Sequence, residues 1–247
     1  MRNLLIEISY NGANYHGYQV QANAITITEV IQDTIEKILK KRENIVGCSR
    51  TDSKVHANSY YFNMKTESNI PCEKFITVIN NALPDDIVIL SCREVDMDFH
   101  ARYNCIGKEY IYKIYNNPVR NPYLIDLALH HKKYIDVDAL NKAAQVFVGT
   151  HDFTSFCSMG FKQGTSMIKT IEFIEVYREN DFINIKVKAD AFLYNMVRII
   201  VGTLLYVNDG KIKPEDLIHI IEAKDRTKAG KTAPPQGLYL NQVFFDT

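Results

Sequence analysis

Apolar and polar residues alternate along several stretches of the chain with the period of two that is typical of strands burying one face. The first stretch, 3–10, places Leu4, Ile6 and Ile8 on one face. The same pattern predicts six further strands, over 59–65, 87–95, 108–115, 168–177, 182–189 and 238–244. Turn-forming residues at 179–181 join two of these strands into a hairpin.

Five helices are expected between the strands. The first is capped by Thr28 or Thr26 and runs to about Lys41, and Ile31 and Ile35 belong to its apolar stripe. Pro71 begins the second helix at a position where its missing N–H costs little. The helices are predicted over 26–41, 71–82, 137–148, 192–207 and 214–223, and a polar loop is expected over 44–48.

Strands and helices alternate in two comparable halves, and the composition shifts at the proline-containing segment 116–122. We therefore expect two domains, 1–116 and 117–247. Neighbouring strands are placed to form hairpins, so the predicted fold class is α+β, a mixed α/β chain with two related halves around a largely antiparallel sheet. The glycine-rich motifs of dinucleotide-binding proteins and P-loop NTPases are absent from the sequence, which argues against those two classes.

Composition narrows the class of protein. The 247 residues are 46% hydrophobic and 23% charged, as in ordinary globular proteins. No apolar run is long enough to span a membrane, and the first residues do not resemble a signal peptide, so a cytoplasmic location is expected. The five cysteines and seven histidines lack metal-ligand spacing, so no metal is expected. Twenty-nine basic residues balance 29 acidic ones, which disfavours a nucleic-acid partner unless the basic residues gather on one face.

One polar segment combines several chemically active side chains. Residues 49–57 hold Arg50, Asp52, Lys54 and His56 between two predicted strands. Loops held at strand ends commonly carry catalytic groups. By composition alone, a solvated turn is the favoured explanation of this segment.

Five blocks of the sequence resemble, in order, the motifs of the TruA family of tRNA pseudouridine synthases. The first contains Arg50, Thr51 and Asp52 followed by Val55 and His56. The others are the Lys-Glu-Tyr-Ile-Tyr run at 108–112, the Gly-Thr-His-Asp-Phe-Thr-Ser-Phe run at 149–156, the apolar block 192–204 with its single Arg198, and the Ala-Pro-Pro-Gln-Gly-Leu-Tyr-Leu run at 233–240. The resemblance covers nearly the whole chain and implies a pseudouridine synthase fold with a central active-site cleft.

The resemblance also implies three catalytic residues. Asp52 matches the aspartate that acts as nucleophile or base, and it must be ionised to do so. Arg198 matches an arginine that pairs with this aspartate and lowers its pKa. The predicted helix 192–207 places Arg198 well inside an apolar stretch, where an arginine needs an acidic partner. Tyr110 matches the tyrosine that stacks on the target base and helps to remove its C5 proton. Tyr112, on the same strand face, is expected to be structural.

Substrate contacts follow from the same resemblance. Arg50 matches the residue that fills the gap left by a flipped base. Val197 and Leu240 are expected to form apolar walls of the uracil pocket, and His56 to position the loop. The expected RNA-binding residues are Arg50, Lys54, Lys108, Lys162 and Lys169, with further cations at Lys224, Arg226, Lys228 and Lys231.

The sequence departs from the family pattern inside the first block. Ser49, Ser53 and Lys54 replace residues that are usually small, and Lys54 stands where the family has glycine. If that position has a positive φ, Lys54 carries a strain of about 1–2 kcal/mol. We expect these substitutions to affect the geometry of the loop and the range of substrates more than the chemistry.

The implied function is isomerisation of uridine to pseudouridine in the anticodon stem-loop of tRNA, at the conventional positions of about 38 to 40, by a homodimer without a cofactor. Two alternatives stay open from the sequence. One is a catalytically altered RNA-binding paralogue of the same fold, suggested by the substituted loop. The other is an unrelated hydrolase that uses Asp52 with a histidine, although the motifs of such enzymes are missing.

Overall fold

The computed structural model describes residues 1–158, 164 and 166–246. It divides into two compact units, Met1–Ile106 with Tyr239–Thr247, and Gly107–Leu238. These units differ from the expected halves 1–116 and 117–247 at both ends of the second half. The difference arises because the last strand pairs with a strand of the first unit, while the strand Cys105–Asn116, which lies just before the expected boundary, pairs with strands of the second.

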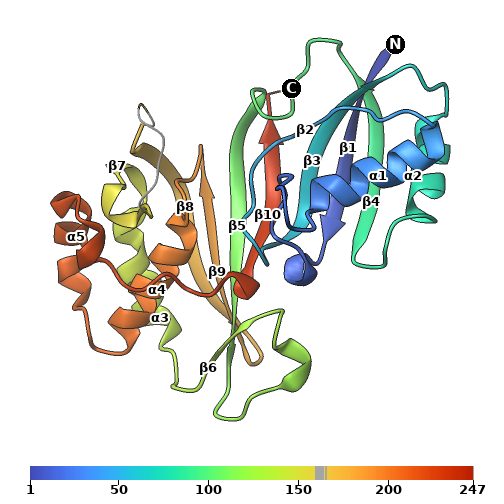
Figure 1. Cartoon of the computed structure of the whole chain (residues 1–247). Coiled ribbons are helices and arrows are strands. Elements are labelled where there is room, and N and C mark those ends of the chain that lie inside the picture. The colour runs from blue at the N-terminus through green and yellow to red at the C-terminus, as the bar shows by residue number, and fades with distance from the viewer. Residues whose placement is uncertain (159–163, 165, 247) are drawn as a thin grey trace. The chain divides into compact units, whose positions relative to one another are not determined.

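The first unit is built on a sheet in the order β4-β1-β3-β10, with β2 paired to β3. The strands pair antiparallel except for β10, which runs parallel to β3. Their bounds are β1 Arg2–Tyr10, β2 Ile45–Gly47, β3 His56–Thr66, β4 Ile87–Val95 and β10 Leu238–Phe245. Helices α1 (Ile27–Leu39) and α2 (Cys72–Asn80) lie beside this sheet (Figure 1).

The apolar stripe predicted for the first helix forms the core of this unit. Ile31 and Ile35 of α1 are buried together with Leu4, Ile6 and Ile8 of β1. Thr26 is the N-cap of α1, because its side-chain oxygen accepts a hydrogen bond from the Glu29 backbone N–H at 3.4 Å. Of the two caps that the sequence allowed, Thr26 is therefore the one used.

The second unit has strands in the order β5-β9-β8-β7, all antiparallel, with β6 running parallel to β5. Helices α3, α4 and α5 also belong to this unit (Figure 1). The bounds are β5 Cys105–Asn116, β6 Leu129–His131, β7 Gly149–Asp152, β8 Ile168–Glu179, β9 Phe182–Ala189, α3 Val137–Ala144, α4 Met196–Asn208 and α5 Leu217–Ala223. The predicted hairpin is confirmed: Asn180 has a φ of 54° in the turn between β8 and β9.

Short 3-10 helices connect these elements. They are Gly12–Asn14, Pro122–Leu124, Gln145–Phe147, Thr154–Phe156, Pro214–Asp216, Arg226–Lys228 and Pro235–Gly237. Together with the sheets they confirm the expected class, a mixed α+β chain whose strands pair mostly antiparallel.

Three predicted elements were wrong in detail. The segment 44–48 was expected to be a loop but contains β2, which is too short to show an alternating pattern. The helix predicted over 137–148 ends at Ala144 and continues as a 3-10 turn. The helix predicted over 192–207 begins only at Met196, because Asn195 adopts a left-handed conformation with a φ of 62°.

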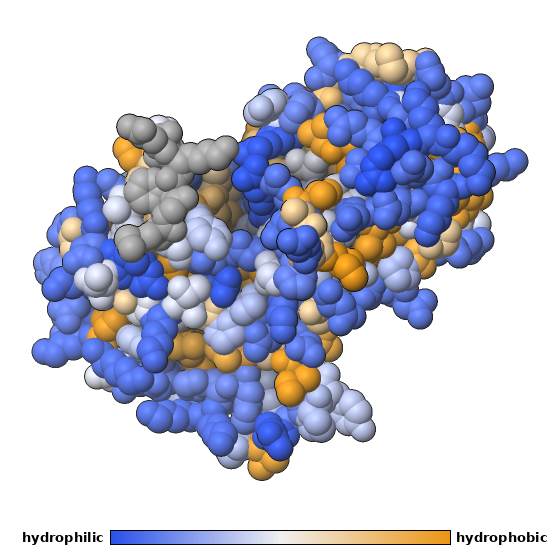
Figure 2. All heavy atoms as spheres, in the orientation of Figure 1, coloured by the Kyte–Doolittle hydropathy of each residue, from blue (hydrophilic) through white to orange (hydrophobic). Residues whose placement is uncertain are grey.

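Exposed apolar residues are scattered over the described surface. On the face drawn in Figure 2, hydrophilic residues predominate and hydrophobic ones form small groups between them. Within the described ranges, none of the helices has both the length and the apolar character that crossing a membrane requires.

Candidate active site

Asp52 lies in the loop between β2 and β3, and buried residues on either side of it anchor this loop. Thr51 and Val55 on either side of it are buried, whereas Asp52 is half-buried and Arg50 and Lys54 are exposed. The Val55 N–H donates to the Asp52 carbonyl oxygen at 3.2 Å and closes a tight turn. The anchors therefore hold the backbone while the ionisable side chains remain accessible.

Three tyrosines support this loop. The Tyr60 hydroxyl donates to the Ser49 carbonyl oxygen at 2.5 Å and accepts from the Ser49 N–H at 3.3 Å. Tyr18 stacks on Tyr60 with ring centroids 4.1 Å apart, and the hydroxyls of Tyr10 and Thr51 are 2.8 Å apart. The sequence analysis did not identify these tyrosines as site residues. Their only signal was the inward position of Tyr10 and Tyr60 on predicted strands.

We predict that Tyr60→Phe destabilises the protein by about 1–3 kcal/mol, because it leaves two polar backbone atoms of Ser49 without their partner. The measurement is the urea midpoint of unfolding, with the exposed Tyr103→Phe as the matched control. A Tyr60→Phe variant as stable as the control would show that this hydroxyl does not support the loop.

Two glycines allow a second segment to lie directly against the loop. A Cβ on Gly12 would stand 2.0 Å from the Val55 carbonyl oxygen, and one on Gly17 would stand 2.5 Å from that of Thr51. Gly17 also has a φ of 90°, which favours glycine. The two backbones are joined where the Tyr18 N–H donates to Thr51 at 3.2 Å. Residues 12–18 thus lie directly against the loop between β2 and β3 and fix its backbone.

Lys54 occupies the left-handed conformation that the sequence analysis raised as a possibility. Its φ is 64°, and it is the third residue of the turn that Asp52 begins. Turns with a positive φ at this position favour glycine, which explains the usual family residue. Its N–H donates to the Tyr15 carbonyl oxygen at 3.1 Å, so the strained backbone is held in place by the same segment 12–18.

We predict that Lys54→Gly stabilises the protein by about 0.5–1 kcal/mol, the strain relieved less the extra flexibility of glycine in the unfolded chain. Lys40→Gly is a matched control, because Lys40 also has a positive φ of 58° but ends α1. Urea unfolding should show a similar gain for both variants, and only Lys54→Gly should weaken RNA binding. A loss of stability in Lys54→Gly would contradict the assigned strain.

His56 positions the loop rather than serving as an accessible base. Its side chain is 1% exposed, and Nδ1 accepts a hydrogen bond from the Gly12 N–H at 3.1 Å. Its ring stacks on Tyr239 of β10, with centroids 4.5 Å apart. Leu240, the next residue, is fully buried and pairs in register with Ala57 of β3.

Arg198 lies in the first turn of α4, not deep within a helix as expected. Its Nε donates to the Ala233 carbonyl oxygen at 2.8 Å, and Nη1 donates to Asn195 Oδ1 at 2.6 Å. The helix dipole disfavours a cation at this end, so the dipole adds to the need for nearby negative groups. Arg198 therefore needs negative partners because it lies at the N-terminal end of α4, and not because it is deep inside the helix.

The last two sequence blocks fold onto each other in the second unit. Ala233 N–H donates back to the Arg198 carbonyl oxygen at 3.0 Å, and Gly230 N–H donates to Thr203 Oγ1 at 2.9 Å. A Cβ on Gly202 would stand 1.7 Å from the Lys231 carbonyl oxygen. Gly202 leaves room for segment 229–234 to cross α4 at close distance, and Thr203 binds this segment through its hydroxyl.

Tyr110 and Tyr112 share one face of β5 but have different surroundings. Tyr110 is 7% exposed and meets Phe192 edge to face, with centroids 5.1 Å apart. The Tyr112 hydroxyl donates to the Pro234 carbonyl oxygen at 2.7 Å. Burial raises the pKa of Tyr112, and Arg198 opposes this only in part. Tyr112 thus holds the chain beside the segment that Arg198 binds, in keeping with a structural role.

The block at 149–156 is a structural device. Asp152 Oδ1 accepts from the Thr154 N–H at 3.1 Å and from its hydroxyl at 2.6 Å, and Oδ2 pairs with Lys224 at 2.9 Å. Burial acts to raise the pKa of Asp152, but these hydrogen bonds outweigh it and lower the pKa. Phe153 and Phe156 beside it are fully buried. Through Asp152 the block therefore ties the start of the 3-10 helix at Thr154 to Lys224.

The remaining expected site residues are dispersed through the second unit. Val197 is buried in the first turn of α4, and Lys108 is half-buried on β5. The Lys169 ammonium donates to the carbonyl oxygens of Ser166 and Ile168. Lys162 lies outside the described residues. In the described part of the chain, no three His, Cys, Asp or Glu side chains cluster in a way that would hold a metal ion.

Comparisons with known proteins agree with the sequence blocks. A family model described as tRNA pseudouridine synthase matches residues 7–104 and 143–246. The chain is 46% identical over 245 residues to tRNA pseudouridine synthase A of Thermoanaerobacter sp. (strain X514), covering 99% of this chain and 100% of that protein. It is 47% identical to tRNA pseudouridine synthase A of Ruminiclostridium cellulolyticum, covering 99% of this chain and 100% of that protein. It is 44% identical to tRNA pseudouridine synthase A 2 of Clostridium tetani, covering 99% of each chain.

Proposed function

The chain belongs to the tRNA pseudouridine synthase family and isomerises uridine to pseudouridine in tRNA, and we propose that it does so in the anticodon stem-loop with Asp52 as the reacting carboxylate. The observation that supports the role of Asp52 is the loop itself. Buried anchors and three tyrosines fix its backbone, and Asp52 is half-buried at its turn. A rigid loop keeps a reacting group in position without paying for its ordering during the reaction.

The isomerisation breaks the bond between uracil N1 and the ribose, turns the base, and joins C5 to the ribose. In the proposed mechanism the Asp52 carboxylate acts in one of two ways. As a nucleophile it bonds to ribose C1′ while the C1′–N1 bond breaks, and C5 of the turned base then displaces it; as a base it removes a proton. After the rejoining, the C5 proton is lost to a base, and Tyr110, stacked on the uracil, assists this step. Nothing is oxidised and no group is imported, so the scheme requires no cofactor.

Arg198 completes the proposed chemistry by holding Asp52 in its ionised form. A guanidinium near a carboxylate lowers the pKa of that carboxylate. Support comes from the surroundings of Arg198, whose guanidinium is oriented by Ala233 and Asn195 through two hydrogen bonds. A cation fixed in this way is a preorganised electrostatic group.

We further propose that other residues of the family pattern recognise the RNA. Arg50, which is exposed beside Asp52, fills the space of the flipped base, and Val197 and Leu240 line the uracil pocket. Phosphate contacts are assigned to Lys54, Lys108, Lys162 and Lys169. A homodimer that binds one tRNA across both subunits, and a cytoplasmic location, belong to the same proposal.

The test is release of tritium from tRNA transcripts labelled at uracil C5. We expect release from transcripts with uridines at about 38 to 40, and none after all of these are replaced by cytidine. Release that persists after the replacement would contradict the anticodon stem-loop as the target. Tight tRNA binding without release from any transcript would favour an RNA-binding protein that has lost catalysis.

A further inference from the structure

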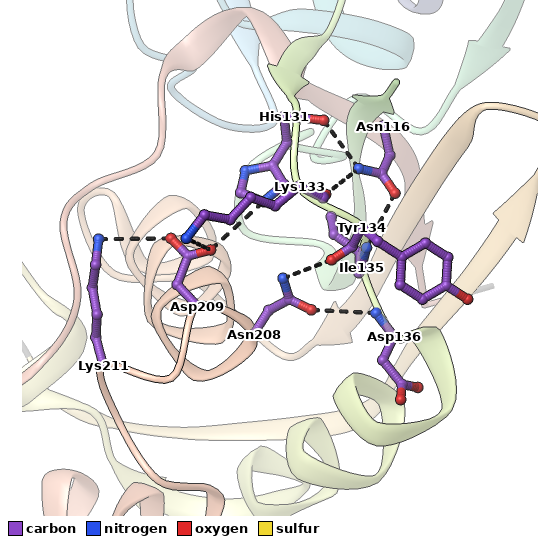
Figure 3. Close-up of polar contacts among 9 residues, drawn as sticks. All are labelled: Asn116, His131, Lys133, Tyr134, Ile135, Asp136, Asn208, Asp209 and Lys211. Atoms are coloured by element: carbon purple, nitrogen blue, oxygen red, sulfur yellow. Dashed lines mark hydrogen bonds and ion pairs between the residues drawn. The ribbon is translucent and has the colours of Figure 1, made fainter. Parts of the chain in front are cut away.

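Segment 131–136 of the second unit has no regular secondary structure after His131, but side-chain hydrogen bonds fix its backbone. The Asn116 side chain donates to the carbonyl oxygens of His131 at 3.0 Å and Lys133 at 2.6 Å, and accepts from the Ile135 N–H at 3.2 Å. Asn208, the last residue of α4, donates to the Tyr134 carbonyl oxygen at 3.1 Å and accepts from the Asp136 N–H at 3.2 Å (Figure 3). Two asparagines thus satisfy five backbone groups of this segment.

The exposed side chains of this segment are two lysines, one tyrosine and one aspartate, Asp136. Lys132, Lys133 and Tyr134 are exposed, and the side chain of Lys133 is 70% exposed. The loop after α4 adds Lys211 and Lys213, which are also exposed. We call Lys132, Lys133, Tyr134, Lys211 and Lys213 the lysine patch.

Asp209 gathers two of these lysines from separate elements. Lys133 Nζ lies 3.6 Å from its Oδ1, and Lys211 Nζ lies 3.6 Å from its Oδ2 (Figure 3). The Asp209 side chain is only 14% exposed, whereas both ammonium groups reach solvent. Burial lowers the pKa of the neighbouring His131, so the positive charge here comes from lysines. Asp209 therefore holds the ammonium groups of Lys133 and Lys211, which come from separate elements, at one shielded carboxylate.

Tyr134 provides a flat surface beside the lysines. Its side chain is 77% exposed, and the Arg178 guanidinium lies 5.3 Å from the ring centroid. Arg178 is itself fixed by hydrogen bonds to Asn116 Oδ1 and the Ile135 carbonyl oxygen. Exposed aromatic rings among cations are typical of surfaces that bind nucleic acids through phosphates and base stacking.

We propose that the lysine patch is a second RNA-binding site, at which Lys133 and Lys211 bind backbone phosphates and Tyr134 stacks on a base or ribose of the same tRNA. The proposal rests on the proposed function for the identity of the RNA. Its ligand class follows from the patch: four lysines favour a polyanion, and a rigid backbone lowers the entropy cost of binding.

The position of the patch distinguishes it from the groups that act on the target uridine. Arg198 lies in the first turn of α4, and Asp209 follows the last residue of the same helix. Eleven residues of helix separate them by about 16 Å. The patch therefore contributes to the affinity for tRNA, and we expect it to change KM without changing kcat at saturating tRNA.

The test compares binding of full-length tRNA transcript to wild type and to Lys133→Ala/Lys211→Ala at several salt concentrations. Loss of two phosphate contacts should weaken binding by between about tenfold and a hundredfold near 0.1 M salt, and should lower the salt slope by about 1.5 to 2. The matched control is Lys74→Ala/Lys142→Ala, which removes two exposed lysines elsewhere. Tyr134→Ala should weaken binding, and Tyr134→Phe should restore it.

Affinity and salt slope equal to those of the control variant would overturn the proposal. Thermal unfolding of each variant identifies any loss of folding, and the comparison of Tyr134→Ala with Tyr134→Phe gives an independent result if the lysine variant is unstable. Because binding is measured without turnover, the outcome does not depend on isomerisation. A wild type that binds tRNA through the patch but releases no tritium would contradict the proposed function alone.

Discussion

Asp52→Asn should abolish isomerisation while leaving tRNA binding intact. Asparagine has nearly the same shape, and the turn is closed by the backbone oxygen of residue 52, so the loop should keep its geometry. An amide can act neither as the nucleophile nor as the base. We expect the rate to fall by at least about a thousandfold, as when other enzymes lose an essential nucleophile. The measurements are tritium release and filter binding with the same transcript.

The control for this prediction is Asp98→Asn, which removes an exposed carboxylate outside the loop and should leave the rate unchanged. A second control, Ser53→Ala, alters the residue after Asp52, whose hydroxyl donates to the Tyr15 carbonyl oxygen at 3.3 Å. An Asp52→Asn variant that retains the rate of these controls would remove Asp52 from the mechanism.

Arg198→Met is expected to have the second largest effect, a loss of turnover of about a hundredfold or more. Methionine keeps the apolar stem but removes the cation and its hydrogen bonds to Ala233 and Asn195. Without the guanidinium, the pKa of Asp52 should rise, so that activity recovers in part at higher pH. The pH dependence of kcat/KM measures this shift, and tRNA affinity should remain.

Arg226→Met separates this electrostatic effect from support of the neighbouring chain. Arg226 donates to the Gly230 carbonyl oxygen at 2.9 Å and to Thr232 Oγ1 at 3.1 Å, so it holds the same segment from another position. We expect this variant to be less stable but to keep the wild-type pH profile. Full activity of Arg198→Met, or an identical defect in both variants, would contradict the role assigned to Arg198.

The alternating strands were predictable because each buries one face along many residues. Ile87–Val95 was predicted with the bounds observed, and the first strand begins one residue before the predicted start. Strands β6 and β7 were missed because three or four residues cannot show a period. The start of α4 was misplaced because the apolar pattern continues through 192–195, while Asn195 turns the backbone.

Resemblance located Asp52 in the sequence, but not the residues that hold it. Gly12, Gly17 and Tyr18 lie more than thirty residues before the loop and carry no local signal of contact with it. The lysine patch was missed for the same reason. Lys133 and Lys211 are far apart in the sequence, and only the fold brings both to Asp209.

The central claim is that Asp52 carries the isomerisation of uridine in tRNA, and a single-turnover experiment tests it most directly. Excess wild-type or Asp52→Asn protein is mixed with tRNA transcript tritiated at uracil C5, and tritium release is followed with time. We expect complete release from uridines of the anticodon stem-loop with wild type and no release with the variant, at equal tRNA occupancy. Release by Asp52→Asn at the wild-type rate would contradict this claim.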